Sequence, residues 1–398
     1  MEFDEKLMRQ LCDFDRIPDV VVNNSRPATV NIMIPSITKQ DLTAGPMGIL
    51  HFGYMLACAG INVRCLVCFD VDVDIDALRG VAALSKMADM VEFEYLHRRN
   101  GALEINENDV CVATLWVSAY VARAVQAKCR NKKFIYMIQD HETIFYPNSS
   151  TSALVANTYE MEYNAIFSTD ILKTFFHQQK IGRFGREQVN CTVFDTAALP
   201  CLMAHDDFVK PRVGKKQFAF YGRPKHPRNC YELGLYIIKQ AIKKNILNPD
   251  EWDFISIGAD NVDIPLVENV TMRVLPYMAI DEYRHRMSTV DLCLSLMQSP
   301  HPSMVPIDLA LSGAVVVTNT YANKTEDVLQ QISKNILAAN ADVESILAKL
   351  AQAVGRVDDY ESRYNNARQS KYCTDYTQMF NGAHLQWIKN LYPGLGTL

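Results

Sequence analysis

Short apolar runs of strand length alternate along the first half of the chain with longer segments of helical length. The strand-like runs lie at residues 30–34, 63–69, 91–95, 109–114, 133–140 and 164–169. Helix-like segments occupy residues 45–60, 118–129 and 170–179. Continuous apolar strands that alternate with helices are typical of a parallel sheet covered on both faces. The first half is therefore predicted to form a doubly wound, Rossmann-like α/β domain.

The same alternation starts again after residues 205–216, a polar stretch with Pro and Gly that we interpret as a linker. The strand-like runs of the second half lie at residues 217–222, 252–258, 270–276, 290–296 and 314–319. Its helix-like segments lie at residues 230–244, 281–287 and 306–311. This pattern predicts a second open parallel sheet. We expect a cleft between the two domains, because ligands of such sheets bind beyond the carboxyl ends of the strands.

The C-terminal part of the chain is predicted to be helical, near residues 342–356 and 358–369 and in a final amphipathic helix at 376–391. The apolar stripe of this final helix has to be buried against another part of the molecule. We place the segment boundaries at residues 1–208, 209–373 and 374–398.

Composition narrows the classes of function. The 398 residues carry 40 Lys and Arg against 45 Asp and Glu, with no long run of like charge, which argues against nucleic acid as a partner. The apolar runs are far shorter than the ~20 residues that cross a bilayer. The acidic residues 1–14 do not resemble a secretory signal. Most of the 11 Cys lie in apolar runs, so we expect free thiols in a reducing, cytoplasmic compartment.

A basic loop is expected where the first strand of the second half leads into its helix. The candidate residues of this loop are Gly222, Arg223, Lys225 and Arg228. Asn229 and Glu232 have the spacing of a capping box, which would place the helix start, with its free amides, beside these cations. Cations beside a helix N-terminus at the end of a strand predict a diphosphate site. The alternative is a solvated basic loop, although two prolines restrict it.

A second loop, stiffened by prolines, precedes the short helix expected at residues 306–311. It offers backbone amides and the side chains of His301 and Ser303, on either side of Pro302, to an anion. In the first turn of the helix, Asp308 is placed to accept hydrogen bonds from paired hydroxyls of a ribose or a sugar. The alternative for Asp308 is a charge that complements the helix dipole.

Polar groups also cluster at the end of the strand-like run 133–140, where Gln139, Asp140, His141 and Glu142 are followed by aromatic residues. Carboxylates that bind hydroxyls, together with aromatic faces that stack on pyranose rings, would form part of a sugar site. The alternative is that Asp140 caps the next helix.

A glycine turn follows the first strand, at residues 41–48. There Gly45, followed by Pro46, allows the backbone to approach a ligand closely. The turn matches neither the three spaced glycines of a dinucleotide site nor a Walker A loop. The chain also lacks a His-Glu-x-x-His motif, two Cys-x-x-Cys pairs and a calcium loop, so no metal site is predicted.

Taken together, these motifs resemble those of a glycosyltransferase with the GT-B fold. The motifs are Gly-Arg-Pro-x-x-Pro-Arg-Asn at residues 222–229, Ser-Pro-His-Pro-Ser at 299–303 and Gly-x-x-Val-Val-x-Asn at 313–319. The chain most resembles the retaining, family 4-like rhamnosyltransferases of bacterial surface-glycan assembly, typified by the enzyme that builds S-layer glycan. The resemblance covers nearly the whole chain. It implies that residues 1–208 bind the acceptor, that 209–373 bind the donor, and that the last helix packs back on the first domain.

The resemblance also implies roles for single residues. Arg223 and Lys225 would neutralise the donor diphosphate, residues 301–303 would approach the phosphate and the transferred sugar, and Asp308 would hold donor hydroxyls. Such enzymes carry two glutamates eight residues apart, whereas this chain has Asp308 at the second position and Pro300 at the first.

The strand end at Leu275-Pro276-Tyr277 matches the place where such enzymes receive the nucleotide base, largely through backbone groups, so Tyr277 is a further candidate. For retention, the base that deprotonates the acceptor is either the leaving phosphate itself or a carboxylate, Asp140 or Glu142.

The implied reaction is metal-independent transfer of a hexose without a cofactor. The donor would be a nucleoside diphosphate sugar such as dTDP-rhamnose, and the acceptor a growing glycan or a lipid-linked saccharide. This places the enzyme in the cytoplasm. A further expectation is that it associates peripherally with the inner face of the membrane. Two rival interpretations stay open, a sugar-nucleotide epimerase on the same fold and a noncatalytic binder of a sugar or nucleotide.

Overall fold

The computed structural model describes residues 17–38, 42, 44–69, 73–81, 84–96, 98, 101–210, 213–258 and 262–395. The acidic residues 1–14, residues 41 and 43 of the glycine turn, and residues 211 and 212 of the predicted linker lie outside the described residues. The chain divides into two compact units. Unit 1 comprises Met1–Ala197 and Asp375–Leu398, and unit 2 comprises Ala198–Thr374.

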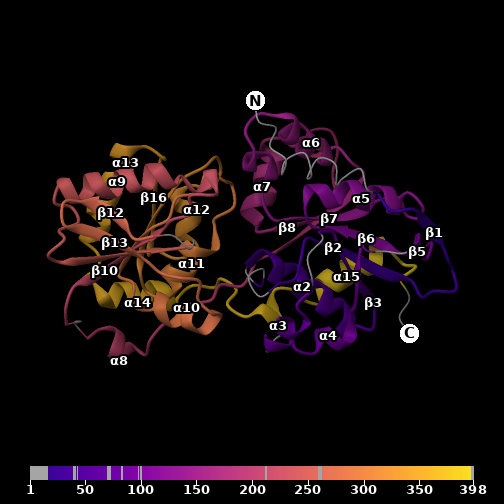
Figure 1. Cartoon of the computed structure of the whole chain (residues 1–398), viewed down its shortest axis with the longest axis horizontal. Helices are drawn as coiled ribbons and strands as arrows, with labels where there is room; N and C mark the ends of the chain where they lie inside the picture. The colour runs from indigo at the N-terminus through magenta and orange to yellow at the C-terminus, as the bar shows by residue number, and fades with distance from the viewer. Residues whose placement is uncertain are drawn as a thin grey trace. The chain divides into compact units, whose positions relative to one another are not determined.

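Within the described residues, unit 1 contains a sheet of seven strands in the order β4-β3-β2-β6-β7-β8-β9 (Figure 1). The strands are β2 (Thr29–Ile34), β3 (Asn62–Val67), β4 (Glu92–Tyr95), β6 (Val110–Ala113), β7 (Phe134–Ile138), β8 (Tyr163–Ser168) and β9 (Cys191–Phe194). All neighbouring strands are parallel. Every residue of β2, β7 and β8 is buried, which explains their continuous apolar runs.

Three strands of unit 1 were not predicted from the sequence. β1 (Val20–Val22) and β5 (Leu103–Ile105) form a separate parallel pair, and β9 is the edge strand of the main sheet. Each has only three or four residues, which is too short for a clear period of apolar positions.

Helices cover both faces of this sheet. They are α2 (Ala44–Cys58), α3 (Ile75–Gly80), α4 (Met87–Met90), α5 (Trp116–Gln126), α6 (Ser150–Thr158) and α7 (Asp170–Gln178), with 3₁₀ turns η1 (Glu142–Phe145) and η2 (Gly182–Gly185). In Figure 1, α5, α6 and α7 lie on one side of the strands and α2 lies on the other, beside α15 (Gly382–Leu391). No helix in the described part of the chain combines the length and the hydropathy that a bilayer crossing requires.

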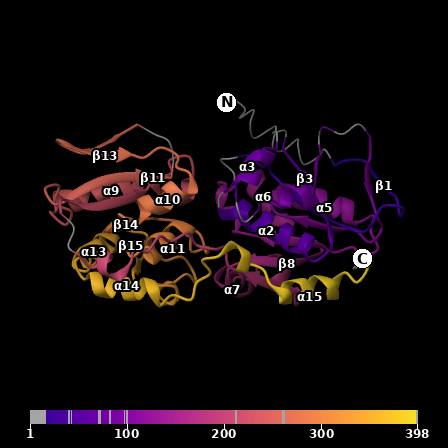
Figure 2. The same ribbon diagram turned by 90° about the horizontal axis from the view of Figure 1, so that it is seen from below.

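The final helix is shorter than predicted. A 3₁₀ turn, η4 (Tyr376–Gln378), precedes it, and α15 begins only after Asn381, whose side chain caps it. The helix lies along unit 1 (Figure 2). There His384 Nε2 contacts the Val193 carbonyl oxygen at 2.9 Å, and Asn164 donates to the Tyr392 hydroxyl at 3.0 Å. The apolar residues Met379, Phe380 and Ile388 of the segment are buried.

Unit 2 contains a second seven-stranded sheet, in the order β12-β13-β11-β10-β14-β15-β16. The strands are β10 (Lys216–Tyr221), β11 (Trp252–Ile257), β12 (Ile264–Val267), β13 (Val270–Val274), β14 (Leu292–Leu294), β15 (Val315–Asn319) and β16 (Ile336–Ala339). The sheet is not wholly parallel, because β12 is antiparallel to β13. This edge hairpin and β16 were not predicted. An antiparallel edge on an otherwise parallel sheet is common in doubly wound folds.

The helices of unit 2 form two layers around this sheet (Figure 1). They are α8 (His205–Phe208), α9 (Tyr231–Lys243), α10 (Ile280–Met287), α11 (Met304–Leu311), α12 (Glu326–Gln330), α13 (Val343–Val354) and α14 (Tyr360–Arg368), with the 3₁₀ turn η3 (Pro227–Asn229). Apolar residues of α9 and α13 pack on one face of the sheet, and those of α10 and α11 pack on the other.

Unit 2 begins at Ala198, before the predicted boundary at residue 208. The segment at its start is held by hydrogen bonds, since the Leu199 amide donates to Asp308 at 2.7 Å and the Cys201 amide donates to Ser312 Oγ at 3.0 Å. The Ala198 amide also donates to the Cys373 carbonyl at 2.8 Å, so the two ends of unit 2 lie side by side. The predicted linker instead contains α8 and the first residue of β10.

Candidate functional site

In each sheet the strand order reverses at one point. In unit 2 the chain proceeds from β10 outward to β13, then returns to the other side of β10 as β14 and continues to β16. The connections that leave the neighbouring ends of β10 and β14 therefore diverge. In open α/β sheets, ligands bind at this switch point. The predicted basic loop and the predicted proline-stiffened loop follow these two strands.

Hydrogen bonds join these two loops. The Gln298 amide donates to the Arg228 carbonyl at 2.7 Å, and Asn229 Nδ2 donates to the Leu296 carbonyl at 3.4 Å. Two segments far apart in the sequence thus form one structure beside the switch point of unit 2.

The Arg223 guanidinium is oriented by its neighbours. It is half-buried, and it donates to the Tyr221 hydroxyl at 3.3 Å and to His226 Nε2 at 2.6 Å. Burial, together with the positive charges of Arg223 and Arg228, lowers the pKa of His226 to about 4. His226 is therefore neutral near pH 7 and accepts the hydrogen bond. The Nε atom of Arg223 is buried, and no described group accepts a hydrogen bond from it.

The other predicted residues of this loop differ in exposure. Lys225 is exposed, whereas Arg228 is half-buried and Gly222 is buried. A Cβ atom at Gly222 would lie 2.6 Å from Ser256 Oγ, so a side chain is excluded there.

The predicted capping box at Asn229 is wrong. Asn229 is the last residue of η3, and Cys230, with a φ of 49°, precedes α9 without a side-chain cap. The Asn229 side chain is buried and turns to the Leu296 carbonyl instead, because the two loops pack together here.

The second loop leads directly into α11. The His301 amide donates to Ser299 Oγ at 3.0 Å, and the Ser303 amide donates to His301 Nδ1 at 3.0 Å. His301 thus uses Nδ1 as an acceptor, which places its ring proton on Nε2. Pro302 and Ser303 are buried, and no side chain caps α11, which begins at Met304. An uncapped helix N-terminus presents amides and positive potential to an anion.

The Asp308 carboxyl group faces the interior of unit 2. It is 5% exposed, accepts from the Leu199 amide at 2.7 Å and accepts from the Tyr283 hydroxyl at 3.0 Å. Burial raises the pKa of Asp308 to about 7. Both oxygens have partners within the protein, so these contacts favour a role in holding the start of unit 2 against α11. The binding of donor hydroxyls by Asp308 stays a prediction.

Tyr277 follows β13, one strand beyond β11, and is 50% exposed. This places it at the same edge of the sheet as the two loops, because β10, β11 and β13 are mutually parallel. Its contact with a nucleotide base stays a prediction.

In unit 1 the strand order reverses between β2 and β6, and the remaining predicted residues lie near that point. A Cβ atom at Gly45 would lie 3.1 Å from Gln139 Oε1, so the glycine turn meets the end of β7. Asp140 and Glu142 are 8% and 4% exposed. Glu142 Oε2 accepts from the Trp116 amide, the first of α5, at 2.9 Å. Glu142 therefore caps α5, because a carboxylate at a helix N-terminus accepts from a free amide and complements the helix dipole.

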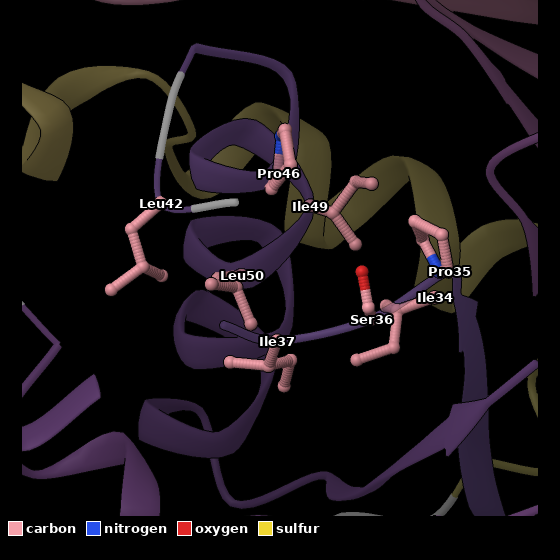
Figure 3. A pocket seen from close by; sticks show the side chains of 8 residues that line it. All are labelled: Ile34, Pro35, Ser36, Ile37, Leu42, Pro46, Ile49 and Leu50. Atoms are coloured by element: carbon pink, nitrogen blue, oxygen red, sulfur yellow. The ribbon is translucent and has the colours of Figure 1, made fainter. Parts of the chain in front are cut away.

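An apolar pocket lies beside the same switch point (Figure 3). It is lined by the segment after β2 and by the first turns of α2, namely Ile34, Pro35, Ser36, Ile37, Leu42, Pro46, Ile49 and Leu50. Its interior is about 10 Å³, which is the space that one water molecule needs.

Two polar residues of unit 2 are buried beside the second loop: Asn319, the last residue of the motif at 313–319, and Lys324, which was not singled out from the sequence. Asn319, at the end of β15, and Lys324, in the turn that follows, are both fully buried and both contact Met297 of the second loop. The polar sequence of the turn after β15 does not indicate that Lys324 is buried. Within the described ranges, no group of three or more His, Cys, Asp or Glu side chains is arranged to hold a metal ion.

Comparison with known proteins identifies the family. Residues 29–170 match the model described as WsaF, N-terminal domain, and residues 216–351 match the model described as WsaF, C-terminal domain. The chain is 32% identical over 261 residues to O-antigen biosynthesis protein RfbC of Myxococcus xanthus. That match covers 62% of this chain and 18% of the relative, so the chain spans about a fifth of the relative's length.

Solved structures show the same fold. Sucrose-phosphate synthase of Thermosynechococcus elongatus superposes with a TM-score of 0.58 at 13% identity, over 92% of this chain and 99% of that one. Anabaena HepE in complex with UDP-glucose superposes with a TM-score of 0.58 at 14% identity, over 93% of this chain and 100% of that one. The prediction of a GT-B fold is confirmed. The chain belongs to the WsaF family of GT-B glycosyltransferases, as the sequence resemblance to S-layer rhamnosyltransferases predicted.

Proposed function

We propose that this protein transfers rhamnose from a nucleoside diphosphate donor, dTDP-rhamnose, to a hydroxyl group of a growing bacterial surface glycan. Family membership supports sugar transfer, and the relative named for O-antigen biosynthesis supports a surface glycan as the product. Donor binding is supported by a structural neighbour that was solved with UDP-glucose. The acceptor would be reached in the cytoplasm, at the inner face of the membrane if it is linked to a lipid.

The observation that carries the proposal is the joining of two loops at the switch point of unit 2. One loop contributes the oriented guanidinium of Arg223, and the other leads to the uncapped N-terminus of α11. Charge-assisted hydrogen bonds from a guanidinium and from helix amides are the interactions that bind a diphosphate without a metal ion.

In the proposed reaction, the bond between the anomeric carbon and the diphosphate oxygen breaks while the acceptor oxygen bonds to the same carbon. Negative charge develops on the departing diphosphate, and the cationic loop stabilises it more strongly in the transition state than in the bound donor. For retention, the leaving phosphate oxygen takes the proton of the acceptor hydroxyl on the same face.

Unit 1 is the proposed acceptor-binding unit. Asp140, just after β7, is the carboxylate we assign to the acceptor hydroxyls; its Oδ1 accepts from the His141 amide at 2.8 Å, while Glu142 accepts from the first amide of α5. His141 is half-buried and neutral near pH 7, because partial burial lowers its pKa to about 4. It therefore contributes no positive charge near the acceptor.

The test is calorimetric titration of the full chain with dTDP, UDP and GDP, followed by incubation of each corresponding sugar nucleotide with and without saccharide acceptors. We expect binding of dTDP, and rhamnosyl transfer with retained anomeric configuration by NMR. Conversion of the donor in the absence of acceptor would identify an epimerase instead. Binding of donor without turnover across the acceptors would identify a noncatalytic binder, and absence of nucleoside diphosphate binding would refute the donor site.

A further inference from the structure

Lys324 is a lysine with 0% exposure. It lies in a turn after β15, where the Tyr321 amide donates to the Lys324 carbonyl at 3.0 Å and the Lys324 amide donates to the Tyr321 carbonyl at 2.8 Å. Lysine is rarely fully buried, because removing its charge from water is costly. The contacts of the fully buried Lys324 ammonium group therefore have to compensate for its removal from water.

The ammonium group is directed at the backbone of the second loop. Lys324 Nζ donates to the Met297 carbonyl at 2.9 Å, and Asn319 Nδ2 donates to the same oxygen at 3.1 Å. The Met297 amide donates to Asn319 Oδ1 at 2.6 Å. The side chains of Asn319 and Lys324 thus hold both polar groups of Met297.

The residue fixed in this way is adjacent to the junction of the two loops. Gln298, which follows Met297, donates its amide to the Arg228 carbonyl at 2.7 Å. Burial raises the pKa of the Cys230 thiol, directly before α9; the positive charge of Lys324 opposes this rise, and the negative charge of Glu232, in the first turn of α9, adds to it. The Lys324 ammonium therefore contacts the proline-stiffened loop and acts electrostatically on the residue that precedes α9.

We propose that Lys324 is a positioning residue of the donor site, whose buried positive charge holds the Met297–Gln298 backbone in place and adds to the attraction for the donor diphosphate. This inference rests on the proposed function. Asn319 shares the hydrogen bonding to Met297, and Lys324 alone supplies the charge. In an interior of low dielectric constant, a charge attracts an anion over a longer range than it does in water.

The charge is separable from the hydrogen bond. Lys324→Gln keeps an N–H donor but removes the charge, whereas Lys324→Arg keeps the charge, and Lys324→Met removes both. Lys349→Met is the matched control, because it removes a lysine of the same unit that is paired with Glu326 at 2.7 Å rather than with the loop.

The experiment is titration of each full-length variant with dTDP and with thymidine, and in parallel with UDP and uridine. We expect Lys324→Gln and Lys324→Met to weaken dTDP binding at least tenfold while thymidine binding changes less than twofold. Lys324→Arg should recover most of the dTDP affinity, and Lys349→Met should leave it unchanged. Far-UV circular dichroism and a thermal melt establish that each variant is folded.

Equal losses for dTDP and thymidine would overturn the proposal, because a merely structural lysine would disturb the whole loop. Unchanged dTDP affinity in Lys324→Gln would overturn it as well. If only Lys324→Met fails to fold, Lys324→Gln and Lys324→Arg decide the result. A wild-type chain that binds neither dTDP nor UDP would refute the proposed function itself. If the wild type binds dTDP and Lys324→Gln binds it equally tightly, only the role of Lys324 is refuted.

Discussion

The switch points of the two units have the same topology and different side-chain chemistry. In unit 2 the loop after β10 carries Arg223, Lys225 and Arg228, and the buried Lys324 contacts the loop after β14. In unit 1 the described residues that line the pocket after β2 are mostly apolar, and the polar residues at the end of β7 include two acids, Asp140 and Glu142, beside Gln139 and His141. Strand order thus determines where a ligand can bind, whereas the loop side chains determine which ligand it is. A cationic switch point suits a diphosphate, and an acidic one suits hydroxyl groups.

The largest expected effect tests which cation of unit 2 matters. Arg223→Ala should lower kcat/KM by roughly 10²–10³-fold, as removal of a donor to a developing charge does in other enzymes. Lys225→Ala should lower it by less than about threefold, because an exposed ammonium is screened by water. Steady-state kinetics with the donor varied would measure both. Comparable losses in the two variants would show that exposure is a poor guide to the diphosphate contacts.

One glycine in each unit allows the stability effects of the same substitution to be compared. Gly258, after β11, has a φ of 105°, and a Cβ atom there would lie 2.5 Å from the Tyr221 ring, so Gly258→Ala should cost about 3 kcal/mol of unfolding free energy. Gly45→Ala should change stability by less than about 0.5 kcal/mol, since helix propensity offsets a contact with the flexible end of Gln139. Urea denaturation would measure both. Loss of activity in a stable Gly45→Ala would show that a ligand approaches the backbone there.

The pH dependence of stability should reveal the buried acid of unit 2. The pKa of Asp308 in the folded chain is about 7, above its ordinary value of 3.8, so the folded state keeps a proton that the unfolded state has released between these values. The contribution of Asp308 to the free energy of unfolding therefore falls as pH rises through this window. Asp308→Asn should remove a decline of about 2 kcal/mol between pH 5 and pH 6.5. Parallel curves for wild type and variant would contradict this.

The smallest effect concerns the acid of unit 1 that caps α5. Glu142→Ala should cost about 1 kcal/mol of unfolding free energy, through loss of the acceptor for the Trp116 amide. Glu142→Gln keeps an acceptor and should retain both stability and turnover. A Glu142→Gln variant that is stable but inactive would show that this carboxylate takes part in catalysis. The base that deprotonates the acceptor hydroxyl would then come from unit 1.

Much of the fold follows from the sequence because the central strands are buried on both faces. In β2, β7 and β8 every residue is buried, so apolar runs mark them without ambiguity. The edge strands β12 and β16 are short, and β12 is partly exposed, so their patterns are weak. Prolines and Gly222 correctly marked the loops at the ends of β10 and β14.

The details of the site depend on contacts between distant segments, which local patterns do not contain. Asn229 has the sequence signature of a cap, yet packing against Leu296 decides its orientation. Lys324 looks like a solvated residue in a polar turn, and only the return of the chain after β14 buries it. Asp308 has the position of a ligand-binding acid, and its hydrogen bonds with the Leu199 amide and the Tyr283 hydroxyl join segments that no local pattern connects.

The hydrogen bond between the Ala198 amide and the Cys373 carbonyl joins the first and last segments of unit 2. Along the sequence, unit 2 is thus inserted between the two segments of unit 1, and its continuous stretch of chain has neighbouring ends. Such a segment is suited to being exchanged whole between relatives by recombination, because a replacement with equally close ends leaves the host sheet and its returning helix undisturbed. Under the proposed function, exchange of unit 2 alone would change the donor preference.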